Sequence, residues 1–145
     1  MLPPIRPTSA HSVEVASIAW PLKRKAALAA ALAWTAGIFV ACLWPGKELP
    51  HSDIPFIDKW THFILFGVFA LLWLITYPSR RFARLLAIFI LATALGILVE
   101  CLQMALPALG RSGEVMDAVA DAVGGAIGAG AYYFFSGRKP ARLPL

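Results

Sequence analysis

Four long apolar runs constrain this chain more than any other feature of its sequence. Each is close to the roughly 20 helical residues that cross the hydrocarbon core of a bilayer. The runs cover residues 26–44, 60–77, 85–106 and 115–135. The chain is 59% hydrophobic and only 14% charged, whereas about a quarter of a soluble domain is charged. The sequence therefore predicts an all-α integral membrane four-helix bundle.

Polar segments at both ends divide the chain into a membrane domain and two tails. Residues 1–24 are polar and contain several prolines, which predicts a flexible N-terminal tail. Residues 25–136 form the predicted membrane domain, and residues 137–145 form a basic C-terminal tail. The net charge of +5 comes mainly from basic residues that flank the apolar runs. Because the basic residues flank the apolar runs, the positive net charge does not indicate nucleic acid as a partner.

The distribution of Lys and Arg predicts the orientation of the bundle. Four spans place both termini on one side, and cytoplasmic loops carry an excess of these residues. Most of them lie in the two tails and in the loop between the second and third runs, leaving Lys47, Lys59 and Arg111 for the other side. Both termini are therefore expected to be cytoplasmic, with loops 45–59 and 107–114 outside.

Charged and amide side chains interrupt the apolar runs, where they are costly unless they have partners. Spacings of three or four residues place members of a pair on one face of a helix. The pairs are Asp58 with His62, Glu100 with Gln103, and Asp117 with Asp121. We expect these faces to turn toward each other in the outer half of the membrane.

Small residues mark two further faces for close helix packing. Gly124 and Gly128 form a Gly-x-x-x-Gly spacing in the fourth run, which lets another backbone approach closely. The stripe in the first run consists of Ala26, Ala30, Ala33, Gly37 and Ala41. Both faces are predicted to pack against neighbouring helices.

Lys59 and Arg111 are the cations nearest to the polar cluster, and the carboxylates outnumber them. A protonated carboxyl group, a charged His62 or a divalent cation could restore the balance. Carboxylates with an imidazole suit a hard or borderline metal, although no specific metal motif is present and no other cofactor is indicated. The two cations could bind a phosphate-bearing head group or only pair with carboxylates. Glu100 and His62 could likewise have structural roles.

The same residues occur in an order that is typical of one family. Residues 58–63 read DKWTHF, followed by Glu-x2-Gln from Glu100, then Arg111, then Asp-x3-Asp-x2-Gly-x3-Gly from Asp117. This pattern resembles the VanZ-like family over roughly residues 40–135, with Asp121 where that family often has Asn. The resemblance implies a small multi-span protein of the bacterial cytoplasmic membrane. The family is named for a protein associated with low-level teicoplanin resistance, and the resemblance implies no particular reaction.

Three functions are consistent with these observations. The first is an envelope protein with an outer-leaflet polar pocket, walled by the last three helices, that alters lipids or lipid-linked precursors and so glycopeptide susceptibility. The second is a membrane-embedded enzyme in which Lys59 and Arg111 hold a lipid phosphate and His62 or a carboxylate is the general acid–base. The third is a non-catalytic partner subunit whose cluster fixes helix registry. A transporter is less expected, because no second half is evident.

Overall fold

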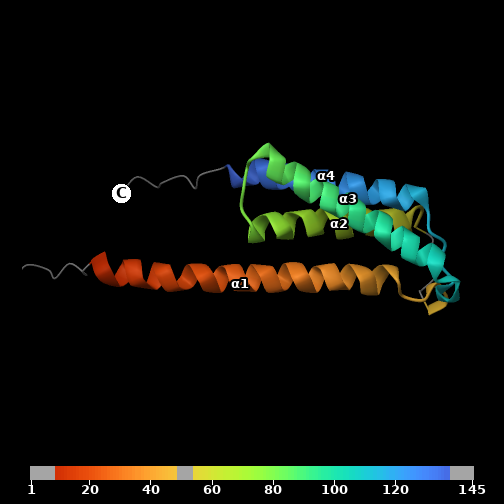
Figure 1. Cartoon of the computed structure of the whole chain (residues 1–145), viewed down its shortest axis with the longest axis horizontal. Helices are drawn as coiled ribbons and strands as arrows, with labels where there is room; N and C mark the ends of the chain where they lie inside the picture. The colour runs from red at the N-terminus through yellow and green to blue at the C-terminus, as the bar shows by residue number, and fades with distance from the viewer. Residues whose placement is uncertain (1–8, 49–53, 138–145) are drawn as a thin grey trace, which may run out of the picture.

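The computed structural model describes residues 9–48 and 54–137, which form four α-helices and no strand (Figure 1). The helices are α1 (Ser9–Cys42), α2 (Ile57–Thr76), α3 (Phe82–Ala105) and α4 (Val115–Ser136). Two short 3-10 helices, η1 (Gly46–Glu48) and η2 (Pro107–Leu109), lie in the connections. All four α-helices are long and apolar enough to cross a membrane. The predicted all-α bundle of membrane-length helices is therefore confirmed, whereas its orientation stays a prediction.

The helix boundaries differ most from the predictions at the N-terminus. The flexible tail predicted for residues 1–24 disagrees with the structure, in which residues 9–24 belong to α1. Once a helix is nucleated, each further residue adds a hydrogen bond, so a helix can extend beyond its apolar part, here Leu22–Cys42. Residues 1–8 and the predicted tail from residue 138 onward lie outside the described residues.

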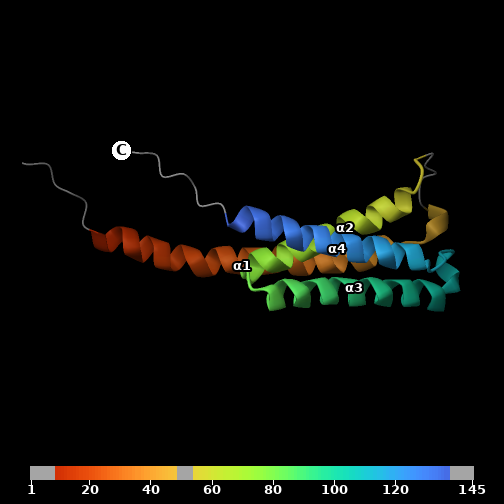
Figure 2. The same ribbon diagram turned by 90° about the horizontal axis from the view of Figure 1, so that it is seen from above.

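Helix α2 lies at the centre of the bundle. It makes its most extensive contact with α4, while α1 packs on α2 and α3 packs mainly on α4. Helix α1 runs beside the other three and extends well beyond them at one end (Figures 1 and 2). The connections that contain η1 and η2 lie together at the opposite end (Figure 1). That end also holds the start of α2, the end of α3 and the start of α4.

Glycines allow the close contact between α2 and α4. A Cβ atom at Gly124 would collide with the carbonyl oxygen of Phe63, and one at Gly128 with that of Gly67. Because these obstacles are backbone atoms, a larger side chain would force the two helices apart. This close approach is the one that the Gly-x-x-x-Gly spacing predicts.

The buried face of α1 is not the small-residue stripe predicted from the sequence. Within that stripe, Ala26, Ala30, Ala33 and Gly37 are exposed. Ala31, Ile38 and Cys42 are buried instead, and Ile38 and Cys42 join the main core cluster, as do Phe66, Phe69, Ala92 and Val99. The indole Nε1 of Trp34 donates to the carbonyl of Leu65 at 2.9 Å. Seating this indole against α2 turns the neighbouring small residues outward.

Candidate functional site

The polar side chains predicted from the sequence gather at the end of the bundle near η1 and η2. Five of them have 5% or less of their surface exposed in a mostly apolar bundle, and these are His62, Glu100, Gln103, Asp117 and Asp121. They come from α2, α3 and α4, and the three- and four-residue spacings place each pair on one inward face. Burial of so many polar groups is costly unless they pair with one another.

Three of these side chains form the centre of the site, and we refer to His62, Glu100 and Asp121 as the inner group. His62 Nδ1 lies 3.0 Å from Asp121 Oδ1 and 3.7 Å from Glu100 Oε1. The other ring nitrogen, Nε2, lies 4.0 Å from the sulfur of Cys42. One imidazole therefore joins α1, α2, α3 and α4 through a single set of contacts.

The inner group contains two carboxylate oxygens whose hydrogen-bonding capacity is unused. Glu100 Oε2 accepts from the backbone N–H of Glu114 at 2.6 Å. By contrast, Glu100 Oε1 and Asp121 Oδ2 are buried and have no hydrogen-bond partner among the described residues. Each such atom costs about 1–3 kcal/mol. Asp121 Oδ2 packs so closely on Gly96 that a Cβ atom there would collide with it, so α3 requires glycine at this position.

Lys59 forms a second layer of charge pairs nearer the loops. Its ammonium group lies 2.7 Å from Glu114 Oε2 and 3.1 Å from Asp117 Oδ1. Asp117 is 1% exposed, whereas Glu114 is exposed. The lysine therefore compensates a carboxylate that is fully removed from solvent. Lys59 is engaged with carboxylates of this chain, which is one of the two roles that the sequence left open.

Arg111 and Gln103 attach the end of α1 to the same site. Arg111 Nη1 lies 3.2 Å from Asp58 Oδ1, and its Nε donates to the carbonyl of Trp44 at 3.2 Å. Gln103 Nε2 donates to the carbonyl of Cys42 at 2.8 Å. Gln103 thus satisfies a carbonyl group at the C-terminal end of α1, where the last carbonyls lack partners within the helix, and Arg111 satisfies one two residues beyond that end. Arg111 is thus also already paired.

Sequence reasoning missed two residues that the structure places at the site. Glu114 stands immediately before α4 and contacts both Lys59 and Glu100. Its position at a helix N-terminus, where acidic residues are favoured, was an available signal. Cys42 contacts His62, and no sequence signal pointed to this because the register between α1 and α2 depends on tertiary packing. Both cysteines are free, Cys42 buried and Cys101 exposed.

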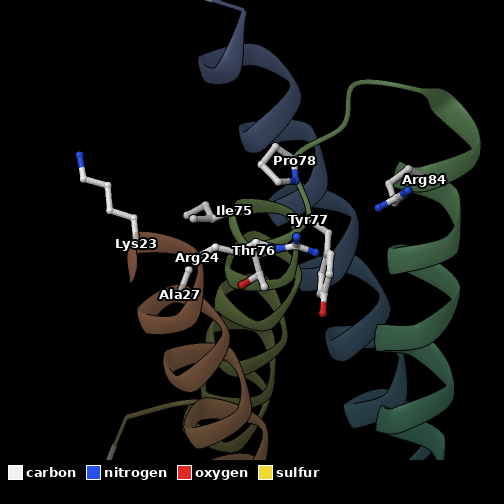
Figure 3. Close-up of a pocket in the computed structure, with 8 residues that line it drawn as sticks. All are labelled: Lys23, Arg24, Ala27, Ile75, Thr76, Tyr77, Pro78 and Arg84. Carbon is white, nitrogen blue, oxygen red and sulfur yellow. The ribbon is translucent and has the colours of Figure 1, made fainter. Parts of the chain in front are cut away.

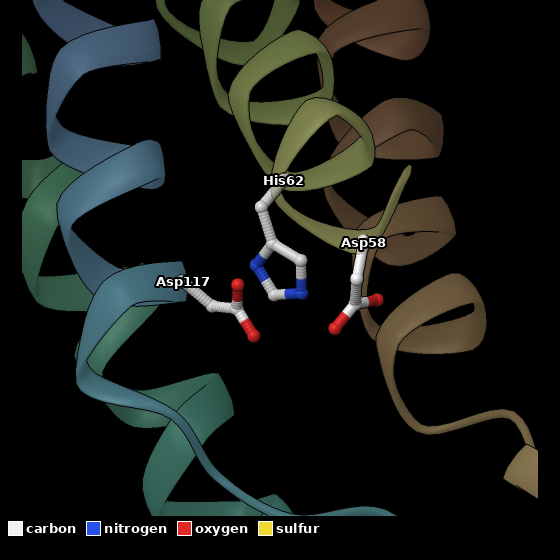
Figure 4. A group of neighbouring side chains, drawn as sticks. All are labelled: Asp58, His62 and Asp117. Carbon is white, nitrogen blue, oxygen red and sulfur yellow. The ribbon is translucent and has the colours of Figure 1, made fainter. Parts of the chain in front are cut away.

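The donor atoms are close enough to hold a metal ion in two overlapping ways. One group consists of Asp58, His62 and Asp117, and the other is the inner group. Within each, the ligand atoms lie within 4.8 Å of one another. Figure 4 shows the imidazole of His62 between the carboxylates of Asp58 and Asp117. Because those two carboxylates also face Arg111 and Lys59, the inner group is the better candidate for a cation.

A groove of about 470 Å³ between α3 and α4 reaches this site from the side of the bundle. Most of its lining is apolar, including Ile97, Val119 and Val123, and Glu100 and Glu114 also line it. The sequence predicted a polar pocket walled by three helices. The groove differs from that pocket, because two helices form it and its character is mainly apolar.

Four membrane-length helices with ionisable groups buried at one end define a multi-pass helical membrane protein with an intramembrane polar cluster. Ionisable groups in such positions are the usual mark of a functional site. A sequence model of the VanZ/LLP1 family matches residues 9–136. The chain therefore belongs to the VanZ/LLP1 family, and the resemblance predicted from its motifs is confirmed. No curated protein and no solved structure matches the chain.

Proposed function

We propose that this protein acts on envelope lipids or lipid-linked precursors in the bacterial cytoplasmic membrane, with the inner group as its working site. The observation that carries the proposal is a pair of buried oxygens, Glu100 Oε1 and Asp121 Oδ2, that have no hydrogen-bond partner among the described residues. A cluster that only fixed helix registry would be more stable with both atoms satisfied. Open hydrogen-bonding capacity at this depth favours a ligand, a proton or a cation as the missing partner.

The groove between α3 and α4 supports a lipid as the molecule acted upon. Its apolar lining suits hydrocarbon chains, and its carboxylates offer acceptors to a head group. A lipid that enters sideways from the bilayer would reach Glu100 at the wall of the groove, next to the buried Oε1 that has no hydrogen-bond partner among the described residues. Altered access to such lipids is expected to change susceptibility to glycopeptides such as teicoplanin, the trait for which VanZ-like proteins are named.

A divalent cation held by the inner group is a second candidate, favoured by the donor atoms within 4.8 Å of one another. Lys59 and Arg111 are already paired with carboxylates, which weakens the hypothesis that they hold a lipid phosphate. Positive charge for a phosphate would then come from the bound cation, as in many enzymes that act on phosphate groups. Asp121, with a free oxygen, and His62 would be its principal ligands.

The decisive experiment compares Glu100→Gln with Glu48→Gln. Both changes remove one carboxylate, but Glu48 lies exposed in η1 and belongs to no described ion pair. Each variant is produced in a bacterial strain that lacks the native protein, and teicoplanin susceptibility, lipid composition and membrane protein level are measured. We expect Glu100→Gln to lose the phenotype at normal protein level and Glu48→Gln to keep it. A wild-type phenotype for Glu100→Gln, and likewise for His62→Ala and Asp117→Asn, would refute the proposal.

The cation is tested separately with purified protein. Binding of Mn²⁺ and Zn²⁺ is measured by calorimetry for the parent, Asp121→Asn and Glu48→Gln. The second candidate requires binding that Asp121→Asn weakens at least tenfold and Glu48→Gln leaves unchanged. Equal binding by all three proteins would place any metal elsewhere, while the lipid proposal would still depend on the phenotype of Glu100→Gln.

A further inference from the structure

A second site lies at the opposite end of the bundle from the inner group. A pocket of about 420 Å³ forms where the start of the apolar part of α1 meets the end of α2 and the start of α3. Its lining includes Lys23 and Arg24 from α1 and Arg84 from α3, and we refer to it as the basic pocket. The chain segment after α2 adds Tyr77 and Pro78. None of these residues belongs to the inner group or to the functional candidates predicted from the sequence.

The charge of the basic pocket is uncompensated within the described part of the chain. Lys23, Arg24 and Arg84 form no ion pair with any residue whose side chain is described. The acidic residues with described side chains all lie near η1, η2 and the inner group at the other end. These residues are Glu48, Asp58, Glu100, Glu114, Asp117 and Asp121. No carboxylate among the described side chains would therefore compete with an anion in the pocket.

Stacked aromatic rings hold one of these cations, Arg24, in place. The guanidinium of Arg24 lies 5.1 Å from the centre of the Tyr77 ring. Tyr77 stacks on Trp73 with the ring planes 8° apart, and Trp73 Nε1 donates to Thr35 Oγ1 of α1 at 3.2 Å. A guanidinium held by its face keeps its N–H edge available for an oxyanion. Figure 3 shows Arg24 and Arg84 extending toward Tyr77, while Lys23 points away.

The position of the pocket along the helices indicates which kind of anion would bind there. Its residues lie at the ends of the candidate spans, which begin or end at Leu22, Thr76 and Phe82, where the head groups of a bilayer are located. Ile75 and Pro78 add apolar surface beside the cations, as the glycerol and upper chain segments of a lipid require. Basic pockets between transmembrane helices are suited to lipid phosphate groups, and Arg binds phosphate through paired hydrogen bonds.

We propose that the basic pocket binds the phosphate head group of an anionic phospholipid from the leaflet at that end of the bundle. The ordinary alternative is that these cations only orient the helices, since basic residues at span ends set topology wherever they stand. Lys25 and Arg81 provide the matched comparison. They are exposed cations at the same end and adjacent in sequence to the same helix turns, but they do not line the pocket.

The test uses the full-length protein in mild detergent and native mass spectrometry. Phosphatidylglycerol or phosphatidylcholine is titrated, and the affinity of the first bound lipid is determined for each variant. We expect phosphatidylglycerol to bind more tightly than phosphatidylcholine. Arg24→Ala and Arg84→Ala should each weaken its binding about fivefold, the size of effect expected for one cation near an anionic lipid. Lys25→Ala and Arg81→Ala should weaken it less than twofold.

Further arms keep the outcome decisive if an alanine variant fails to insert. Arg24→Lys keeps the charge and the topology signal but loses the planar fork, so it should still bind phosphatidylglycerol more weakly than the parent. Equal effects of pocket and comparison variants, or equal affinity of the parent for both lipids, would overturn the proposal. Displacement of phosphatidylglycerol by equimolar inorganic phosphate would show that the pocket serves the free anion instead of a lipid.

Discussion

The contact between α2 and α4 makes a quantitative prediction about Gly124. This residue is buried, and an added Cβ atom would collide with the Phe63 carbonyl oxygen. Overpacking costs about 1–3 kcal/mol, and because the obstacle is backbone that no rotamer change can move, we take the upper value. Alanine improves helix propensity by at most about 1 kcal/mol. Gly124→Ala should therefore lower the free energy of unfolding by about 2 kcal/mol, roughly thirtyfold in the folding equilibrium.

Gly130 is the matched control on the same helix. It is exposed, and among the described residues no atom outside its own helix neighbourhood lies within 4 Å of an added Cβ. Gly130→Ala should leave stability unchanged or raise it by up to about 1 kcal/mol. Both variants are compared with the parent by reversible unfolding in bicelles, with helix content followed by circular dichroism. Equal stability of Gly124→Ala and Gly130→Ala would show that the close approach of α2 and α4 does not limit the fold.

Three further outcomes follow from individual contacts, and a fourth follows from the predicted orientation. Gln103→Leu removes a 2.8 Å hydrogen bond to a carbonyl at the end of α1 and should lower the free energy of unfolding by about 1–2 kcal/mol. Trp34→Phe loses the 2.9 Å bond to α2 and should cost about 1 kcal/mol in the same unfolding assay. Asp121→Asn keeps an acceptor for the imidazole and removes a buried charge, so stability should not fall; a loss above 1 kcal/mol would contradict this. Ser112→Cys, made in a Cys101→Ala background, should react with an impermeant thiol reagent added outside intact cells, and absence of reaction would refute the orientation.

The overall fold was predictable because every backbone N–H and C=O group inside a bilayer must find a hydrogen-bond partner within the protein. Helices satisfy their own N–H and C=O groups, so apolar runs of membrane length specify helices almost without regard to detail. The pairing of polar residues was predictable for a related reason. Spacings of three and four residues place Glu100 and Gln103 on one face of α3, and Asp117 and Asp121 on one face of α4, independently of how the neighbouring helices pack.

Contacts between helices were less predictable, because they depend on rotation about each helix axis. The small residues of α1 satisfied the sequence rule for close packing, yet the buried face is set by Trp34, Ile38 and Cys42. A large indole with a hydrogen-bond partner outweighs a row of alanines, because it buries more surface and satisfies a polar group. The contact between Cys42 and His62 depends on the same rotation, so sequence spacing carried no sign of it.

Asp121, at the centre of the site, is both a buried ionisable group and a point of close helix packing. Gly96 and Gly124 bring α3 and α2 against α4. This packing holds Asp121 at 0% exposure, and its Oδ2 has no hydrogen-bond partner in the described part of the chain. An amide at this position would still accept the hydrogen bond from His62 and would avoid the cost of a buried charge. A carboxylate does what an amide does not: it stabilises positive charge on the imidazole or on a bound cation. The aspartate therefore favours a charge-dependent role for the inner group over helix registry alone.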